Sequence, residues 1–448
     1  MNQTYMKEEK IFPLILKMGM PMVISMLVNS LYNIVDSLFV ARISENAMTA
    51  LSLVFPIQNL ISSAMIGFGI GVNASIAYFL GAKDNRQAEK SASQGMLLAT
   101  IHGLVFMLLC ILGMPAFLKM FTQEAEIIQL GLDYSNIAFL FSVILAWQLL
   151  FEKTFQAVGR MLTTMLCMSI GCIVNIILDP MLIFGIGFFP CMGIKGAALA
   201  TGIGQAAGLI GYIIFYIFRP IPIRYSRKDM KLEKYTLKRL YAVGIPAFLN
   251  LALPSLLVSV LNIILGVFSQ SYIFVLGVYY KLQTFLYLPA NGVVQGMRPI
   301  IGYNYGAGEI HRVRKIFYTA LLIVAAIMVA GTVLCLLIPG QLMGLFTQTS
   351  DTIEKGVEAL QIICIGFIVS SVSVTATGAL EGLGMGLASL IISLCRYTLL
   401  IIPIAYAMSA LIGASGVWHA FWITEVLTAL FSYIFIMRIF KKMKEKNR

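Results

Sequence analysis

The sequence predicts an all-α polytopic membrane protein with twelve transmembrane helices in two six-helix lobes. Composition, the length of the apolar runs and an internal repeat each point to this fold class. Of the 448 residues, 59% are hydrophobic and 12% are charged, whereas ordinary globular domains have about 45 to 50% apolar and about 25% charged residues. A chain this apolar is typical of proteins that reside in a lipid bilayer.

The predicted spans are apolar runs of about 20 residues or more, long enough to cross about 30 Å of hydrocarbon. In the first half they cover residues 14–40, 47–80, 91–112, 126–151, 161–186 and 194–218. In the second half they cover residues 238–268, 272–300, 312–338, 352–380, 386–408 and 416–437. An even number of spans returns the chain to its starting side. The two lobes should therefore insert in the same orientation, related by a pseudo-twofold axis along the membrane normal.

The two halves repeat each other at an offset of 225 residues. The pairs that show this are Gly19 with Gly244, Gln58 with Gln283, Gly67 with Gly292, Gly71 with Gly296 and Phe121 with Phe346. Near the end the offset becomes 220, where Gly193 and Gly196 correspond to Gly413 and Gly416. This period is far longer than the roughly 20 to 50 residues of solenoid repeats. The repeating unit is therefore a whole lobe.

These patterns predict three segments. Residues 1–218 form an N-terminal lobe, 219–237 form a cytoplasmic linker, and 238–448 form a C-terminal lobe with a basic cytoplasmic tail. Two prolines at the start of the linker stop the sixth span. The first apolar run is too long for a cleavable signal, so the first span is expected to remain in the protein.

Basic residues predict the orientation in the membrane. With loops assigned alternately to the two sides, one side collects 24 lysines and arginines, Lys153 and Arg160 among them, and the other side collects 4. Since Lys and Arg are retained in cytoplasmic loops, both termini and the linker are expected inside. The net charge of +12 is thus a topology signal, and nucleic-acid binding is not expected.

Several function classes lack their motifs. The sequence has no phosphate-binding P-loop, and Gly67, Gly69 and Gly71 lie within a span, where they favour close helix packing over dinucleotide binding. Seven cysteines show no metal-ligand spacing, and no nucleophile and base pair indicates an enzyme. We therefore expect no ATP use, no cofactor and no catalysis, with transport driven by an ion gradient.

Two acids lie within predicted spans of the first half. Asp36 and Asp179 are at similar depth in spans that run the same way, and a carboxylate at the centre of a span costs about 2.5 to 3.5 kcal/mol. Asn29, Asn33 and Asp36 follow at i, i+4 and i+7, and Asn175 precedes Asp179 by one turn. The pattern predicts a cation-coupling site that includes Asn33.

The residues alone leave the chemistry of this site open. One acid can carry a proton, or Asp36, Asn175 and Asp179 can hold Na⁺ through oxygen ligands. Alternatively, Asp179 caps or kinks its helix before Pro180 while Asp36 lies at the lipid interface.

The second half carries different polar residues. Leu261 and Ile404 stand where the first half has its two acids, and Lys281, Arg396 and Glu425 lie near mid-depth. They predict either a charge-paired network, Glu425 with Arg396 or with Lys281, or a substrate-contacting or second coupling site. The candidates for the substrate cleft are Asn29, Gln58, Gln205, Lys281, Gln283, Arg396 and Glu425.

Four stretches carry a resemblance to a known family. They are YNIVDSLFV (32–40), NIILDP (175–180), GAALAT (196–201) and PIIGYNYGA (299–307). As a set, in a two-lobe chain, they resemble the multidrug and toxic compound extrusion (MATE) family, and within it the bacterial DinF-like branch. The resemblance covers essentially the whole chain.

The resemblance implies export of organic cations and other amphipathic compounds in exchange for H⁺ or Na⁺. It assigns Asp36, Asn175, Asp179 and Thr201 to the family's cation-site positions, and it implies a multi-pass protein of a bacterial inner membrane. The chain lacks acids in the seventh span and in the body of the tenth, where the NorM-like branch has a second site. Glu381 lies at the cytoplasmic end of the tenth span and does not replace them.

We therefore predict a monomeric antiporter that works by alternating access on small amphipathic or cationic substrates. The alternative is a flippase for a lipid-linked precursor from the same two-lobe superfamily. A flippase needs a strongly cationic cleft for pyrophosphate, for which the candidates are Lys281, Arg298 and Arg396.

Overall fold

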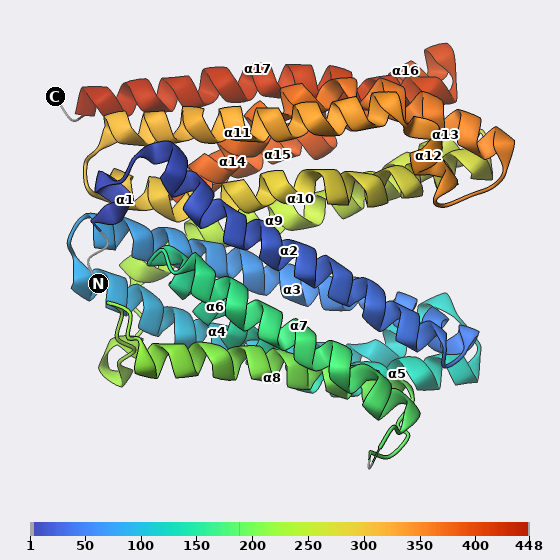
Figure 1. Ribbon diagram of the computed structural model, residues 1–448, viewed down its shortest axis with the longest axis horizontal. Coiled ribbons are helices and arrows are strands. Elements are labelled where there is room, and N and C mark those ends of the chain that lie inside the picture. The colour runs from blue at the N-terminus through green and yellow to red at the C-terminus, as the bar shows by residue number, and fades with distance from the viewer. Residues whose placement is uncertain (1–3, 188, 447–448) are drawn as a thin grey trace. The chain divides into compact units, whose positions relative to one another are not determined.

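The computed structural model describes residues 4–187 and 189–446, and these residues form helices and loops without a strand (Figure 1). Arg448, at the end of the predicted basic tail, lies outside the described residues. The first half contains α1 (Tyr5–Glu8), α2 (Ile11–Ala41), α3 (Glu45–Gly81), α4 (Asn85–Phe121), α5 (Ala125–Leu140), α6 (Ser142–Ala157), α7 (Met161–Phe184) and α8 (Ile194–Phe218). The rest contains η1 (Arg227–Met230), α9 (Lys234–Gly266), α10 (Gln270–Gly306), α11 (Ile310–Leu337), α12 (Pro339–Gly344), α13 (Ser350–Ile363), α14 (Ile365–Gly382), α15 (Gly386–Leu394), η2 (Cys395–Leu399), α16 (Ile401–Ile412) and α17 (Ala414–Lys446).

Ten of the described helices are long and apolar enough to cross a membrane. The pair α5 and α6, which bends by 48° at a short break, forms one further span. The remaining predicted span, residues 272–300, corresponds to α10, which has the length of α3 but carries Pro289, Pro299 and several polar side chains that lower its hydropathy. The predicted eleventh span is α15, η2 and α16 in succession.

The helices pack into two compact units that differ from the predicted lobes in two segments. Unit 1 contains Ile24–Phe248, and unit 2 contains Thr4–Val23 together with the chain from Leu249 onward. The start of α2 thus packs with the second half, and the start of α9 packs with the first. Two long helices are therefore each divided between the units.

Repeated glycines explain this exchange. In unit 1, a Cβ on Gly67 would lie 2.5 Å from the backbone nitrogen of Phe248, and one on Gly71 would collide with the carbonyl oxygen of Leu240. In unit 2, the repeat partner of Gly71 is Gly296, where a Cβ would lie 2.6 Å from the nitrogen of Gly19. Small residues let two helix backbones approach closely. The start of α9 therefore packs on the glycine face of α3, and the start of α2 packs on the glycine face of α10.

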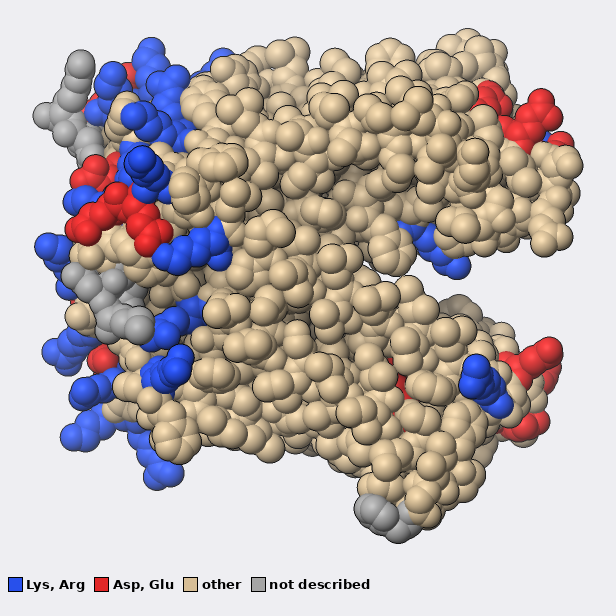
Figure 2. Space-filling model, viewed as in Figure 1, with Lys and Arg blue, Asp and Glu red and all other residues tan. Residues whose placement is uncertain are grey.

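Each unit exposes apolar side chains along its helices. Leu112, Ile217, Leu322 and Leu411 are among the most exposed, at 65 to 77%. On the face drawn in Figure 2, Lys and Arg side chains gather at one end of each unit, and the surface along the helices is almost free of charge. Such uncharged flanks match a hydrocarbon environment. The protein is a multi-pass membrane protein.

One predicted loop residue is buried. Lys153 was assigned to a loop because of its charge, but it lies inside α6 and is 4% exposed. Its ammonium group pairs with the neighbouring Glu152 at 2.7 Å. The loop assignment was therefore wrong, because a carboxylate within the same helix lets this lysine be buried.

Candidate cation site

Two acidic side chains from distant parts of the sequence meet inside unit 1. Asp36 on α2 is 8% exposed and Asp179 on α7 is fully buried. Their carboxyl groups lie within hydrogen-bonding reach of each other. Two carboxyl groups can form a hydrogen bond only if one of them holds a proton. The arrangement therefore requires a proton or another cation for its stability.

Asn175 and Thr201 complete the cluster from α7 and α8. Asn175 lies one turn before Asp179, and its amide nitrogen donates to Asp179 Oδ1 at 3.4 Å and to Thr201 Oγ1 at 3.4 Å. Both residues are buried. The site thus combines side chains from three helices of one unit.

Three buried oxygens of this cluster are available to a cation. No hydrogen-bond donor among the described residues reaches Asp36 Oδ1, Asn175 Oδ1 or Asp179 Oδ2. Buried oxygens without a donor are costly, and carboxylate and amide oxygens are the ligands that hard cations prefer. These oxygen ligands fit Na⁺, and the paired carboxyl groups fit a proton equally well.

Two tyrosines surround this cluster. The Tyr32 hydroxyl, one turn before Asp36 on α2, and the Tyr134 hydroxyl on α5 both lie near Thr201 and the two acids. Gln58 donates to the Tyr134 hydroxyl at 3.2 Å, which connects a predicted cleft residue to the acids. The four-residue spacing of Tyr32 and Asp36 was a usable sequence signal, whereas Tyr134 had none.

Other predicted residues of unit 1 are less buried than the two acids. Asn33 is exposed, and its amide donates to Asn29 Oδ1 at 2.9 Å. Gln205 is partly buried, one turn after Thr201 on α8. The helix α7 continues through Asp179 to Phe184, so Asp179 does not cap it.

In unit 2 the predicted charges separate into a pair and a single lysine. Glu425 Oε1 accepts from Arg396 at 2.7 Å, and both side chains are buried or nearly so. The Lys281 side chain is exposed, with its ammonium 5.9 Å from the ring of Phe346. Of the two predicted partners of Glu425, Arg396 is the one that pairs with it in the structure. Gln283 lines the same small cavity as this pair.

Comparison with known proteins places this architecture in a family. The MatE family model matches residues 21–181 and again residues 246–407, two segments that begin 225 residues apart and together cover most of the chain. The chain belongs to the MatE family. The double match also coincides with the internal repeat, so each lobe is one MatE unit.

Relatives of this MatE chain extend over almost its full length. It is 26% identical over 433 residues to the multidrug export protein MepA of Staphylococcus aureus (strain MSSA476), covering 96% of this chain and 95% of MepA. A MATE crystal structure in the bent conformation superimposes with a TM-score of 0.93 at 22% identity, covering 100% of this chain and 99% of the other. The two-lobe, twelve-helix fold is thereby established.

A second solved structure has the same fold. A MOP superfamily transporter from Pyrococcus furiosus Vc1 (DSM3638) matches with a TM-score of 0.90 at 21% identity, covering 99% of each chain. Reverse polarity of its binding pocket has been taken to suggest a different function.

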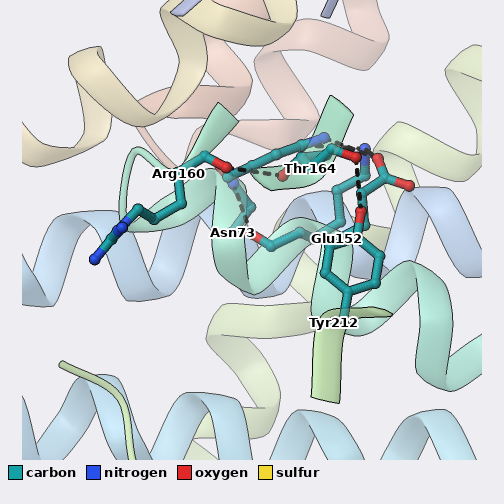
Figure 3. Close-up of polar contacts among 7 residues, drawn as sticks. Asn73, Glu152, Arg160, Thr164 and Tyr212 are labelled. Atoms are coloured by element: carbon teal, nitrogen blue, oxygen red, sulfur yellow. Dashed lines mark hydrogen bonds and ion pairs between the residues drawn. The ribbon is translucent and has the colours of Figure 1, made fainter. Parts of the chain in front are cut away.

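Unit 1 of this MatE chain also contains a polar cluster that the sequence did not indicate. Lys153 donates to Glu152 at 2.7 Å and to Gln156 at 3.2 Å, and Gln156 donates back to Glu152 at 2.8 Å. Asn73 of α3 donates to the backbone oxygen of Lys153 at 3.0 Å (Figure 3). The cluster connects α3 to α6, and Tyr212 of α8 lies beside it in the same view.

Proposed function

We propose that this chain is a secondary active exporter that exchanges H⁺ or Na⁺ for organic cations and other amphipathic drugs or metabolites. The observation that carries the proposal is the meeting of Asp36 and Asp179 with donor-free oxygens in a buried site. The similarity to a protein named as a multidrug exporter supports the substrate class. The relatives are transporters, and we propose no enzymatic activity, no ATP use and a monomeric protein.

Coupling follows from the cost of leaving both carboxylates charged. With a proton or Na⁺ bound, α2 and α7 can hold their acids together, and without it the two negative charges repel in a medium of low dielectric. Loss of the cation thus favours separation of the two helices. Pro21 lies inside α2, two residues before the position at which this helix passes from one unit to the other, and proline is a place where a helix can bend. A cation-dependent bend of α2 is the alternating-access step that we propose.

The distribution of charge gives the proposed location. We assign the basic ends of the units to the cytoplasm, so that both termini lie on the cytoplasmic side of a bacterial inner membrane. The substrate would be taken from the cytoplasmic side and released outside, in exchange for the coupling ion.

The flippase alternative has less support. Two of its three cations are paired with glutamates, Arg298 with Glu381 at 2.8 Å and Arg396 with Glu425 at 2.7 Å. A paired arginine contributes little net positive charge for binding a pyrophosphate. The pairing favours the export of cationic substrates.

The test is accumulation of ethidium, a fluorescent organic cation, in inverted membrane vesicles under proton and sodium gradients imposed separately. We expect one gradient to drive accumulation by the wild type and neither to drive it in Asp36→Asn. Asp351→Asn is the matched control, because it makes the same substitution in an exposed ion pair with Lys355. Gradient-driven accumulation by Asp36→Asn at the wild-type rate would refute the proposal.

A further inference from the structure

A small cavity lies beside the buried ion pair of unit 2. Arg396 and Glu425 line it together with Tyr280, Gln283, Tyr397 and Thr424. Its volume is about 20 Å³, and a cavity needs roughly 10 to 15 Å³ to hold one water molecule. The space suits a single water and is too small for a drug-sized ligand.

The polar lining of the cavity is incompletely hydrogen-bonded. The hydroxyl groups of Tyr280 and Thr424 are buried without a hydrogen-bond partner among the described residues, and Thr424 is 1% exposed. Glu425 Oε2 lies 3.5 Å from the Ser373 hydroxyl, whereas Oε1 accepts from Nε and Nη2 of Arg396, each at 2.7 Å. A buried water needs two to four polar partners, and these groups supply them.

The internal repeat places different residues at the equivalent position of unit 1. Arg396 corresponds to Gly171 at offset 225, and Thr424 corresponds to Gly204 at offset 220. In unit 1 these two glycines are in close contact, since a Cβ on Gly171 would lie 2.8 Å from the carbonyl oxygen of Gly204. Where unit 1 closes its helices directly together, unit 2 has an ion pair and a space.

The backbone of the arginine-bearing helix is also unusual at this point. Residues Cys395–Leu399 form a π-helical turn between α15 and α16, whereas the equivalent part of α7 is regular. Single π-helical turns are rare and frequently occur at functional sites. The turn places Arg396 opposite Glu425 of α17.

We propose that Glu425 is a second protonation site, which exchanges its proton through a water molecule bound in this cavity. A hydronium ion delivered through the cavity transfers its proton to the Glu425 carboxylate and leaves as water, and the reverse transfer restores the ion pair. The proposal goes beyond the cation site of Asp36 and Asp179 and does not depend on it.

The surroundings accommodate both states of Glu425. When it is protonated, its hydroxyl can donate to Ser373 or Thr424. The Arg396 guanidinium, then without its counter-ion, lies 5.2 Å from the ring of Tyr397 and 5.9 Å from that of Tyr287. Aromatic rings at these distances attract a cation, so Arg396 keeps favourable contacts.

Few other titratable groups influence this glutamate. Those around Glu425 are Arg396 and Tyr397 of η2 and three tyrosines of α10, which are Tyr279, Tyr280 and Tyr287. Among the described residues no second carboxylate is recorded as interacting with it. A protonation signal from this part of unit 2 can therefore be assigned to Glu425.

The test is infrared difference spectroscopy of the purified protein during a pH titration without substrate, in H₂O and in D₂O. The Asp36→Asn/Asp179→Asn background removes signals from the first site, so the outcome is independent of the proposed antiport. In this background we expect a carbonyl band of a protonated carboxyl group that shifts in D₂O. The band should disappear when Glu425→Gln is added.

Two further variants keep the test decisive. Replacing the whole pair, Arg396→Met with Glu425→Leu, avoids an unpaired buried charge, and it should also lack the band if Glu425→Gln fails to fold. Glu381→Gln, which alters another arginine-paired glutamate of unit 2, should keep it. Spectra that are unchanged by loss of Glu425, or a band that does not exchange with D₂O, would overturn the proposal.

Discussion

The buried ion pair of α6 allows a stability prediction to be worked out in numbers. Glu152 and Lys153 have side chains that are 6% and 5% exposed, and the lysine has one other side-chain acceptor, Gln156 at 3.2 Å. Glu152→Gln keeps the volume but leaves a buried ammonium without a counter-ion. Breaking such a pair costs about 3 to 5 kcal/mol. For a unit of this size, about 3 kcal/mol corresponds to a fall of roughly 6 to 12 °C in melting temperature.

The assay is the fraction of monodisperse protein that remains after heating in detergent, measured by size-exclusion chromatography. Replacing the whole cluster, by Glu152→Leu, Lys153→Met and Gln156→Leu, should recover most of the loss, because the two buried charges are then removed together. The control is Asp351→Asn, which breaks an exposed pair worth about 0 to 1 kcal/mol. If Glu152→Gln melts no lower than this control, the reasoning about the buried pair fails.

Two further predictions concern helix packing and the cation site. Gly71→Ala should lower the melting temperature, because the new Cβ collides with the Leu240 carbonyl and overpacking costs about 1 to 3 kcal/mol. The control is Gly113→Ala, whose Cβ would have nothing within 4 Å. Equal melting temperatures of the two variants would count against the glycine contact. Thr201→Val should reduce gradient-driven ethidium accumulation severalfold while Thr201→Ser restores it, since the hydroxyl accepts from Asn175 beside the acids. Full transport by the valine variant would remove Thr201 from the site.

The sequence predicted most of the fold and the two acids that meet in the candidate cation site. Apolar run lengths and the 225-residue repeat indicated the spans, because the thickness of the bilayer sets a minimum length for a helix that crosses it. Matching depth and helical spacing predicted from the sequence alone that Asp36, Asn175 and Asp179 form one site. Tyr134 could not be foreseen, because its approach depends on how α5 packs across the unit.

Two features of the fold could not be predicted from the sequence, each for a physical reason. Charge marks loops only when it is unpaired, so Lys153 was assigned to a loop although the adjacent Glu152 permits its burial. Periodicity shows that a helix is long, but it does not show which unit each of its halves contacts. The glycine pairs Gly67 with Gly292 and Gly71 with Gly296 were the signal of that exchange.

The most direct measurement is the displacement of the coupling ion when ethidium is added to the purified protein. Protons would be counted with a pH-sensitive dye in weak buffer, and sodium with ²²Na⁺. The wild type should release one of these ions, and Asp36→Asn/Asp179→Asn should release fewer or none. Release of the same number of ions by both proteins would contradict the assignment of the two acids as the coupling site.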